Sequence, residues 1–188
     1  MQRLIKDLKP TCFEDLIALI ALYRPMPLES GMVNDFIDRK HGKKKVEYPL
    51  PELEHILKET YGMILYQEQI MQIVNKLAGY TSEETNILRE AMREKKEIEK
   101  QRIVFVKRSV KNGINKERAE YAFDLMAKFA EYSFDKSCAA VYAYIAYQTA
   151  YLKTHYKEYF LYATVVNETD ADKVQRYLPT LTLPPHFS

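Results

Sequence analysis

Apolar residues recur at helical spacing along most of the chain. Ile70, Ile73, Val74 and Leu77 share one face of a helix, and the same i, i+3, i+4 spacing returns in segment after segment up to Val166. Capping residues, glycines and prolines mark the ends of these segments. The predicted helices run from Thr11 to Arg24, from about Ser30 to His41, from Pro51 to Tyr61, through Ile70–Leu77 to Gly79, from Thr81 to Met92, through Ile103–Val110 to Asn112, through Ala119–Ala130, from Ser137 to about Lys153, and from His155 to Val166.

Strand signals are few, and Met63–Leu65 is the one short candidate. No proline occurs between Pro51 and Pro179, which permits long helices. We therefore predict an all-α fold, a compact module of eight or nine helices with little or no strand. Residues 1–168 are expected to form one helical domain, and residues 169–188 a linker or an irregular tail.

Composition excludes several classes of protein. With 47% hydrophobic and 29% charged residues among 188, the chain is neither a disordered tail nor a low-complexity fibre. Its two cysteines form no zinc or disulfide pattern, so a reducing compartment is expected. The charged start of the chain is unlike a secretory signal. The longest apolar run, Leu16–Tyr23, is far shorter than the ~20 residues of a membrane span. We expect a soluble, cytoplasmic protein with no membrane partner.

Positive charge is local, although the net charge of +2 is too small to indicate a nucleic-acid partner. Arg39–Lys45 holds five Lys/Arg residues and no acid, and Arg89–Arg118 holds eleven against five acids. Such patches can hold phosphate backbones through Coulomb attraction and counterion release. Charge alone favours a solvated face of Glu–Lys pairs instead. The candidate contacts to a DNA backbone are Arg39, Lys40, Lys43, Lys95 and Lys96.

Lys136 and Ser137 stand directly before a predicted helix. Unpaired N–H groups, the positive end of the helix dipole and a lysine together suit a phosphate group. The simpler interpretation is an N-cap serine beside a solvated lysine, and the neighbouring Asp135 favours it because its charge repels phosphate.

Aromatic and amide side chains offer weaker signals. Nine of the fifteen tyrosines lie between Tyr121 and Tyr162, where they can stack on bases or simply belong to a core. Tyr66–Gln69 forms a polar cluster at a helix entrance, which can bind a ligand or cap the helix. The chain contains no zinc-protease, phosphate-loop, nucleophile-elbow or dinucleotide motif, and its four histidines are scattered. We expect neither a catalytic centre nor a metal site in it.

Several motifs in fixed order resemble a known family. They are Ala21–Pro25, Pro27–Val33, Phe36–Gly42, Glu59–Gly62, Leu65–Gln69, Leu88–Arg89 with Ala91–Met92, and Lys136–Lys153. This succession resembles the fingers region of bacterial replicative DNA polymerase III alpha subunits, the C family of polymerases. The resemblance covers about Leu8 to Glu168.

The resemblance implies a role in DNA-directed DNA synthesis. The family adds deoxynucleoside triphosphates to a primer 3′ end with two Mg²⁺ ions, held by palm aspartates that this chain lacks. The chain is therefore expected to bind no metal and to be inactive alone. Its implied partners are primer–template DNA, the incoming nucleotide and the remaining alpha-subunit domains or replisome subunits. The implied phosphate contacts are Arg24, Arg89, Lys136 and Ser137, and the residues implied to shape the pocket are Tyr66, Gln67, Gln69, Tyr142 and Tyr147.

The sequence departs from the family at positions close to these contacts. Met26 stands where the family has glycine. Glu90, Arg93 and Glu94 stand where it has arginine, glycine and lysine, and Ser133, Asp135 and Cys138 where it has glycine, asparagine and histidine. Losing or reversing one charged contact costs ~2–5 kcal/mol at a buried site and less where water screens it. We expect these changes to weaken or abolish nucleotide binding while the apolar stripes preserve the fold.

Two other functions stay open on these residues. One is a non-catalytic helical module that binds DNA or a replisome partner through its basic faces. The other is a decayed gene product without a function.

Overall fold

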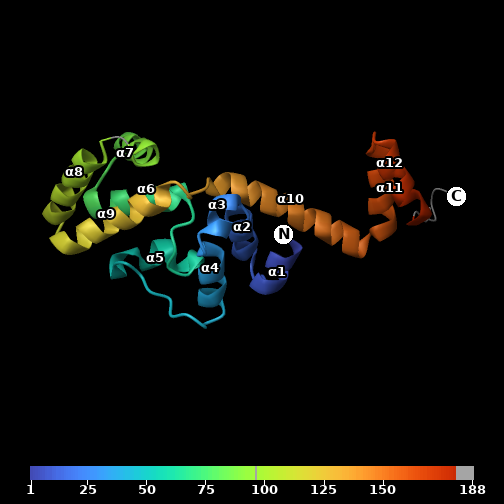
Figure 1. The fold of residues 1–188 in the computed structure, drawn as a ribbon, viewed down its shortest axis with the longest axis horizontal. Helices are drawn as coiled ribbons and strands as arrows, with labels where there is room; N and C mark the ends of the chain where they lie inside the picture. Colours follow the sequence, from blue (N-terminus) through green and yellow to red (C-terminus); the bar gives the residue numbers. More distant parts are fainter. Residues whose placement is uncertain (96, 181–188) are drawn as a thin grey trace. The chain divides into compact units, whose positions relative to one another are not determined.

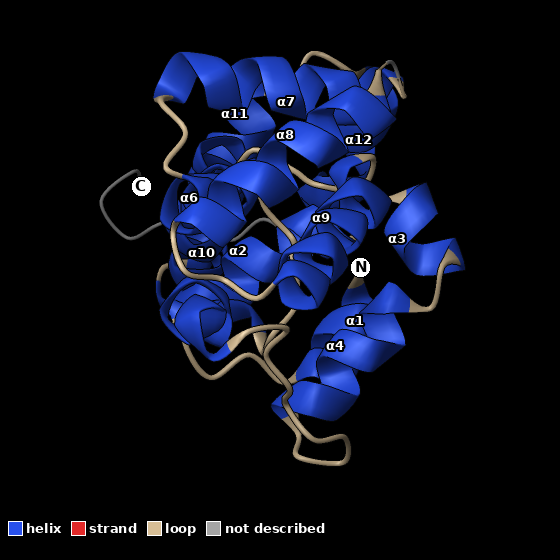
Figure 2. Ribbon diagram, turned by 90° about the vertical axis from the view of Figure 1, so that its left-hand side faces the viewer, coloured by secondary structure: helices blue, strands red, loops and turns tan. Residues whose placement is uncertain are grey.

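Helices make up the regular structure of the described residues, which are 1–95 and 97–180 of this computed structural model. Figures 1 and 2 show helices joined by loops and turns, and no strand is drawn in the described part. The all-α prediction is confirmed, but the predicted number of helices is too low. The α-helices are α1 (Gln2–Leu8), α2 (Phe13–Leu22), α3 (Pro25–Glu29), α4 (Met32–Lys40), α5 (Glu54–Leu57), α6 (Gln67–Ala78), α7 (Ser82–Glu94), α8 (Ile98–Lys111), α9 (Lys116–Ala130), α10 (Lys136–His155), α11 (Lys157–Asn167) and α12 (Ala171–Tyr177).

Short helices account for the difference in number. Pro25 was expected only to end the preceding helix, but it also occupies the first turn of α3, a position that tolerates proline because no intrahelical N–H bond is lost there. At the start of the chain, α1 buries Leu4 and Leu8 one turn apart and contacts α2 and α4. Tertiary packing stabilises such short helices, because isolated ones are marginal in water.

Helix capping follows the sequence prediction at one site and differs at another. The predicted capping box at the start of α7 is confirmed: the Glu84 N–H donates to Thr81 Oγ1 (3.3 Å), and the Thr81 N–H donates to Glu84 Oε2 (2.9 Å). At α2 the prediction was off by one residue. The box uses Cys12 and Asp15, because the shorter Asp15 side chain points back to the backbone N–H groups before the helix.

The main hydrophobic core lies among α6, α7, α8 and α9, which contact one another and are drawn together in Figure 1. The Phe105 ring lies between Tyr80 and Phe123, with ring-centroid distances of 6.3 and 5.6 Å. These rings, with the aliphatic side chains around them, supply most of the apolar burial that holds this part of the fold.

A buried polar network ties α2 and α4 to the turn before α6. Asp15 on α2 accepts hydrogen bonds from Lys40 on α4 (2.7 Å) and from the Tyr61 hydroxyl (3.0 Å). The Tyr61 ring packs edge-on against Phe36 at 5.2 Å. Gly62 follows with φ +80°, and a Cβ there would lie 2.4 Å from the Glu47 carbonyl oxygen, so only glycine fits this close approach.

The strand candidate Met63–Leu65 forms no strand. Instead, an isolated parallel bridge pairs Tyr66 with Phe134. The Phe134 N–H donates to the Leu65 carbonyl and the Gln67 N–H donates to the Phe134 carbonyl, both at 2.9 Å. This bridge joins the segment before α6 to the segment before α10.

The chain divides into two units, Met1–Ala140 and Val141–Ser188, and each is treated by itself below. Among the described residues of the second unit, only Ala143 is buried. The domain boundary predicted at residue 168 stays a prediction. Within the predicted tail, Ala171–Tyr177 is helical, and residues 181–188 lie outside the described residues. No described helix is both long and apolar enough to cross a membrane.

Candidate functional site

The start of α6 is held by the side chain of Gln69, which is 2% exposed. Its Oε1 accepts from the N–H groups of Leu65 (2.8 Å) and Tyr66 (3.0 Å). Its Nε2 donates to the Thr60 hydroxyl (2.8 Å) and to the Ile56 carbonyl (3.3 Å). Every donor and acceptor site of this amide is used. Gln69 therefore fixes the segment before α6 from inside the protein and has no polar site left for a ligand.

The start of α10 is held by carboxylates. The Lys136 N–H donates to both Glu68 oxygens at 3.1 Å, and the Cys138 N–H donates to Asp135 Oδ1 at 2.8 Å. Asp135 is therefore the capping residue, and the prediction that Ser137 caps this helix is wrong. An aspartate placed before the first turn reaches the third N–H group, whereas Ser137 lies inside the turn and is exposed.

The Lys136 ammonium lies close to a carboxylate and an aromatic ring. Its Nζ donates to the two oxygens of Glu59 at 2.8 and 2.7 Å and lies 5.5 Å from the centre of the Tyr66 ring. The side chain is still 36% exposed, so an anion from solvent can approach it.

Tyr66 itself is 2% exposed. Burial, and then the nearby charges of Glu59 and Glu68, raise the pKa of its hydroxyl well above the usual value. The hydroxyl therefore stays protonated, and the apolar face of the ring lies against the ammonium of Lys136.

Arg89, on α7, contacts the first turn of α6. Its Nη1 donates to Gln67 Oε1, while its Nε is buried and has no hydrogen-bond partner in the structure. An unpaired buried N–H is costly, and an anionic oxygen would satisfy it. The Arg89 guanidinium thus contacts Gln67, and the backbone N–H of Lys136 contacts the adjacent Glu68, both in the first turn of α6, while the Lys136 ammonium lies on Glu59.

Arg24 has other partners. Its Nε donates to the Ala21 carbonyl at 2.8 Å and its Nη2 to the Tyr132 carbonyl, and the guanidinium lies 4.6 Å from the centre of the Phe134 ring. Burial lowers its pKa, but an arginine remains charged at neutral pH.

The remaining pocket candidates belong to the second unit. Tyr142 is 63% exposed and Tyr147 is 53% exposed on α10. Their exposure does not fit the core interpretation of these tyrosines, and their role in a nucleotide pocket stays a prediction.

The candidate contacts to a DNA backbone have different surroundings. Arg39 donates to Asp35 (3.0 Å) and to the Tyr61 carbonyl (3.3 Å). The side chain of Lys40 is 5% exposed and lies in the buried ion pair with Asp15. This favours a structural role over the predicted contact to a DNA backbone. Lys43 is 70% exposed and remains accessible to a phosphate.

The second basic segment is also partly paired. The Lys95 Nζ lies 2.6 Å from Glu131, and this carboxylate raises the pKa of Lys95. Lys96 lies outside the described residues.

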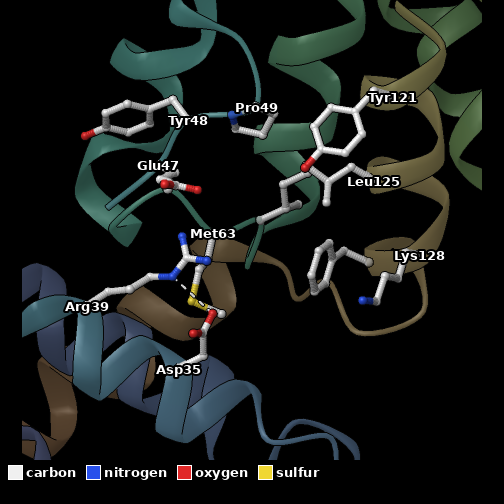
Figure 3. Close-up of a pocket in the computed structure, with 12 residues that line it drawn as sticks. Asp35, Arg39, Glu47, Tyr48, Pro49, Met63, Tyr121, Leu125 and Lys128 are labelled. Carbon is white, nitrogen blue, oxygen red and sulfur yellow. Dashed lines mark hydrogen bonds and ion pairs between the residues drawn. The ribbon is translucent and has the colours of Figure 1, made fainter. Parts of the chain in front are cut away.

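Several clefts of the first unit are lined by residues other than Arg89 and Lys136. One, with a volume of about 420 Å³, is bordered by α4, α9 and the segment before Pro51, and Figure 3 shows Arg39 pointing into it toward Asp35. Its lining includes two acids, Asp35 and Glu47, and two cations, Arg39 and Lys128. Because these charges balance, the cleft has no electrostatic preference for an anion.

No group of three or more His, Cys, Asp or Glu side chains among residues 1–95 and 97–180 could hold a metal ion. Glu59, Glu68 and the Tyr132–Phe134 segment, which contact the predicted phosphate residues, were missed by the sequence analysis. The sequence contained a signal for Glu68, since it lies within the Leu65–Gln69 motif. Glu59 likewise lies within the Glu59–Gly62 motif, but nothing in the sequence indicated its pairing with Lys136, which the fold brings about.

Comparison with known proteins defines the class. The family model described as the bacterial DNA polymerase III alpha subunit finger domain matches residues 1–113. The DNA polymerase III subunit alpha of Haemophilus influenzae is 53% identical over 182 residues, which is 93% of this chain and 16% of that protein. The protein of the same name from Escherichia coli K12 is 52% identical over 177 residues, 90% of this chain and 15% of the relative. That from Pseudomonas aeruginosa is 52% identical over 182 residues.

These relatives are all subunits of a DNA polymerase, and the regular structure of the region they share with this chain is helical in its described part. The chain belongs to the family of bacterial DNA polymerase III alpha subunit finger domains. It spans about 16% of the length of the relatives it matches.

Proposed function

We propose that this chain binds the triphosphate of an incoming deoxynucleotide, together with primer–template DNA, as the fingers of a DNA polymerase whose catalytic carboxylates lie outside it. The observation that supports this most is the buried Nε of Arg89, which has no hydrogen-bond partner and would be satisfied by an anionic oxygen. Lys136 adds an ammonium on a side chain that is 36% exposed, and its backbone N–H contacts Glu68, next to the Gln67 partner of Arg89. In this proposal the chain is inactive alone, and the Mg²⁺ ions belong to the whole enzyme.

The roles within the site follow from its contacts. Lys136 supplies an accessible ammonium, and Arg89 supplies a buried N–H that lacks an acceptor. Ser137 adds an exposed hydroxyl in the first turn of α10. The charge of Lys136 is opposed by Glu59 and Glu68, so an anion must compete with them, and binding is expected to be weak.

The test is a titration of the chain with a deoxynucleoside triphosphate in the presence of primer–template DNA and Mg²⁺. Removing a charged hydrogen-bonding group costs about 1.5–3 kcal/mol, so Lys136→Gln and Arg89→Gln should each weaken binding at least about tenfold. Lys76→Gln removes an exposed cation at the far end of α6 and serves as the control. Wild-type affinity in both site variants would refute the proposal.

A second candidate is a helical DNA-binding module that uses no nucleotide. The carboxylates around Lys136 favour it because they repel phosphate, and so do the exposed lysines of residues 43–45, which lie in the segment without acids. This function predicts DNA binding that weakens steeply with salt and is unchanged by the matching nucleotide. Binding that tightens when the matching nucleotide is added would exclude it.

A further inference from the structure

The segment that leads into α10 is held from two sides. On one side, the Phe134 N–H and carbonyl pair with Leu65 and Gln67 before and at the start of α6. On the other side, the guanidinium of Arg24, at the end of α2, contacts the same segment. Phe134 is only two residues before Lys136, so the position of this segment sets where the ammonium of Lys136 lies.

Arg24 makes two contacts to the segment and one to α2. Its Nη2 donates to the Tyr132 carbonyl, and its Cζ lies over the Phe134 ring, 4.6 Å from the ring centre. Its Nε donates to the Ala21 carbonyl, which fixes the side chain to the last turn of α2. An arginine can make all three at once, because its planar fork donates at the edge while its face stacks on an aromatic ring.

We propose that Arg24 is a positioning residue: it holds the Tyr132–Phe134 segment and thereby sets the start of α10, rather than contacting phosphate as the resemblance implies. The inference rests on the proposed function, since the position of Lys136 matters to a ligand only if Lys136 holds an anion. It assigns Arg24 a different role from Arg89, although both are partly buried arginines of the same unit.

The contacts distinguish this role from a phosphate contact. The Nε and Nη2 of Arg24 both donate to backbone carbonyls, and its Cζ lies over the Phe134 ring, whereas the Nε of Arg89 lacks an acceptor. A phosphate contact acts only when ligand is present. A positioning contact also acts in the ligand-free protein, where it protects the hydrogen bonds of the segment from opening.

The first measurement is therefore amide hydrogen exchange without ligand. Arg24→Gln should speed exchange of the Gln67 and Phe134 N–H groups at least tenfold and leave amides in the middle of α8 within twofold of wild type. Arg24→Lys should do the same, because an ammonium keeps the charge but loses the fork and the flat face. Arg118→Gln, which removes an arginine paired with Glu52, is the matched control. It should leave the exchange rates of the Gln67 and Phe134 amides unchanged.

Phe134→Leu provides a second variant that alters no charge and retains an apolar side chain. It should reproduce the fast exchange. If Arg24 acts only through this segment, Arg24→Gln combined with Phe134→Leu should weaken the binding of inorganic triphosphate no more than the stronger single change does. Circular dichroism of each variant establishes that the helices are formed.

Two results would overturn the inference. Unchanged exchange at Gln67 and Phe134 in Arg24→Gln would show that Arg24 does not hold the segment, and full recovery of exchange and affinity in Arg24→Lys would show that charge alone is needed. A wild-type chain that binds no triphosphate would refute the proposed function and the role of Arg24 in it. The ligand-free exchange still reports separately whether Arg24 holds the segment.

Discussion

The buried carboxylate of Asp15 should make the stability of this protein depend on pH in the acid range. Asp15 is 1% exposed and accepts hydrogen bonds from Lys40 (2.7 Å), the Thr11 N–H (2.8 Å) and the Tyr61 hydroxyl (3.0 Å). Burial raises its pKa, but these hydrogen bonds outweigh burial and lower the pKa from 3.8 to about 2.

The size of the effect follows from the two pKa values. One pKa unit corresponds to about 1.36 kcal/mol, so the shift of Asp15 contributes about 2.4 kcal/mol to the free energy of unfolding near neutral pH. Because the folded pKa lies below the ordinary one, this stability is present above about pH 4. It is lost as the pH falls toward 2, and about 1.5 kcal/mol of it is gone by about pH 2.5.

The assay is urea unfolding, followed by circular dichroism at pH 6 and pH 2.5, for the wild type and for Asp15→Asn. Other carboxylates titrate in both proteins and cancel in the difference. The difference in the free energy of unfolding between the wild type and Asp15→Asn should shrink by about 1.5 kcal/mol from pH 6 to pH 2.5. Asp38→Asn, which removes an exposed carboxylate 3.9 Å from Lys43, is the control. A wild-type advantage that is the same at both pH values would refute the reasoning.

Three further changes test other parts of the structure. Gly62→Ala should lower the free energy of unfolding by about 1–3 kcal/mol, measured by urea unfolding, because φ is +80° and the new Cβ meets the Glu47 carbonyl at 2.4 Å. Lys40→Met should cost about 3–5 kcal/mol in the same assay, because it leaves the Asp15 carboxylate buried without its cation. Asp135→Asn keeps a capping side chain at α10 and removes a negative charge, so triphosphate affinity measured by calorimetry should rise several-fold while stability stays within about 0.5 kcal/mol of wild type.

Each of these has a contrasting outcome. Gly42 also has positive φ but no atom within 4 Å of an added Cβ, so equal losses in Gly42→Ala and Gly62→Ala would rule out the close approach as the cause. A Lys40→Met protein of wild-type stability that no longer binds DNA would support the backbone contact predicted from the sequence. Unchanged triphosphate affinity in Asp135→Asn would count against the start of α10 as the anion site.

Features with a local signal could be predicted from the sequence. The apolar stripe Ile70–Leu77, the capping box at Thr81 and the end of a helix at Gly79 are all present in the structure. Each depends on residues within one or two helical turns of one another, so spacing and side-chain type are enough. The all-α fold follows from the sum of such signals.

Contacts that join distant parts of the chain leave no such local signal. Lys40 lies in a strongly basic segment, which led to its prediction as a DNA contact, but its ammonium is buried against Asp15 on another helix. Arg24 has a carbonyl partner 108 residues away, and no pattern around Arg24 or Tyr132 indicates that pair.

The sequence by itself therefore determined the helical class of this protein, most helix positions and its family, because these depend on local periodicity and on motifs in a fixed order. The tertiary structure alone decided which charged side chains are available to a ligand. Packing placed Lys40 in a buried ion pair, gave Arg24 partners within the protein, and put the ammonium of Lys136 beside Glu59 and the guanidinium of Arg89 beside Gln67. The free energy of a charge depends on its solvation and on its neighbours in space, and neither can be read from its position along the chain.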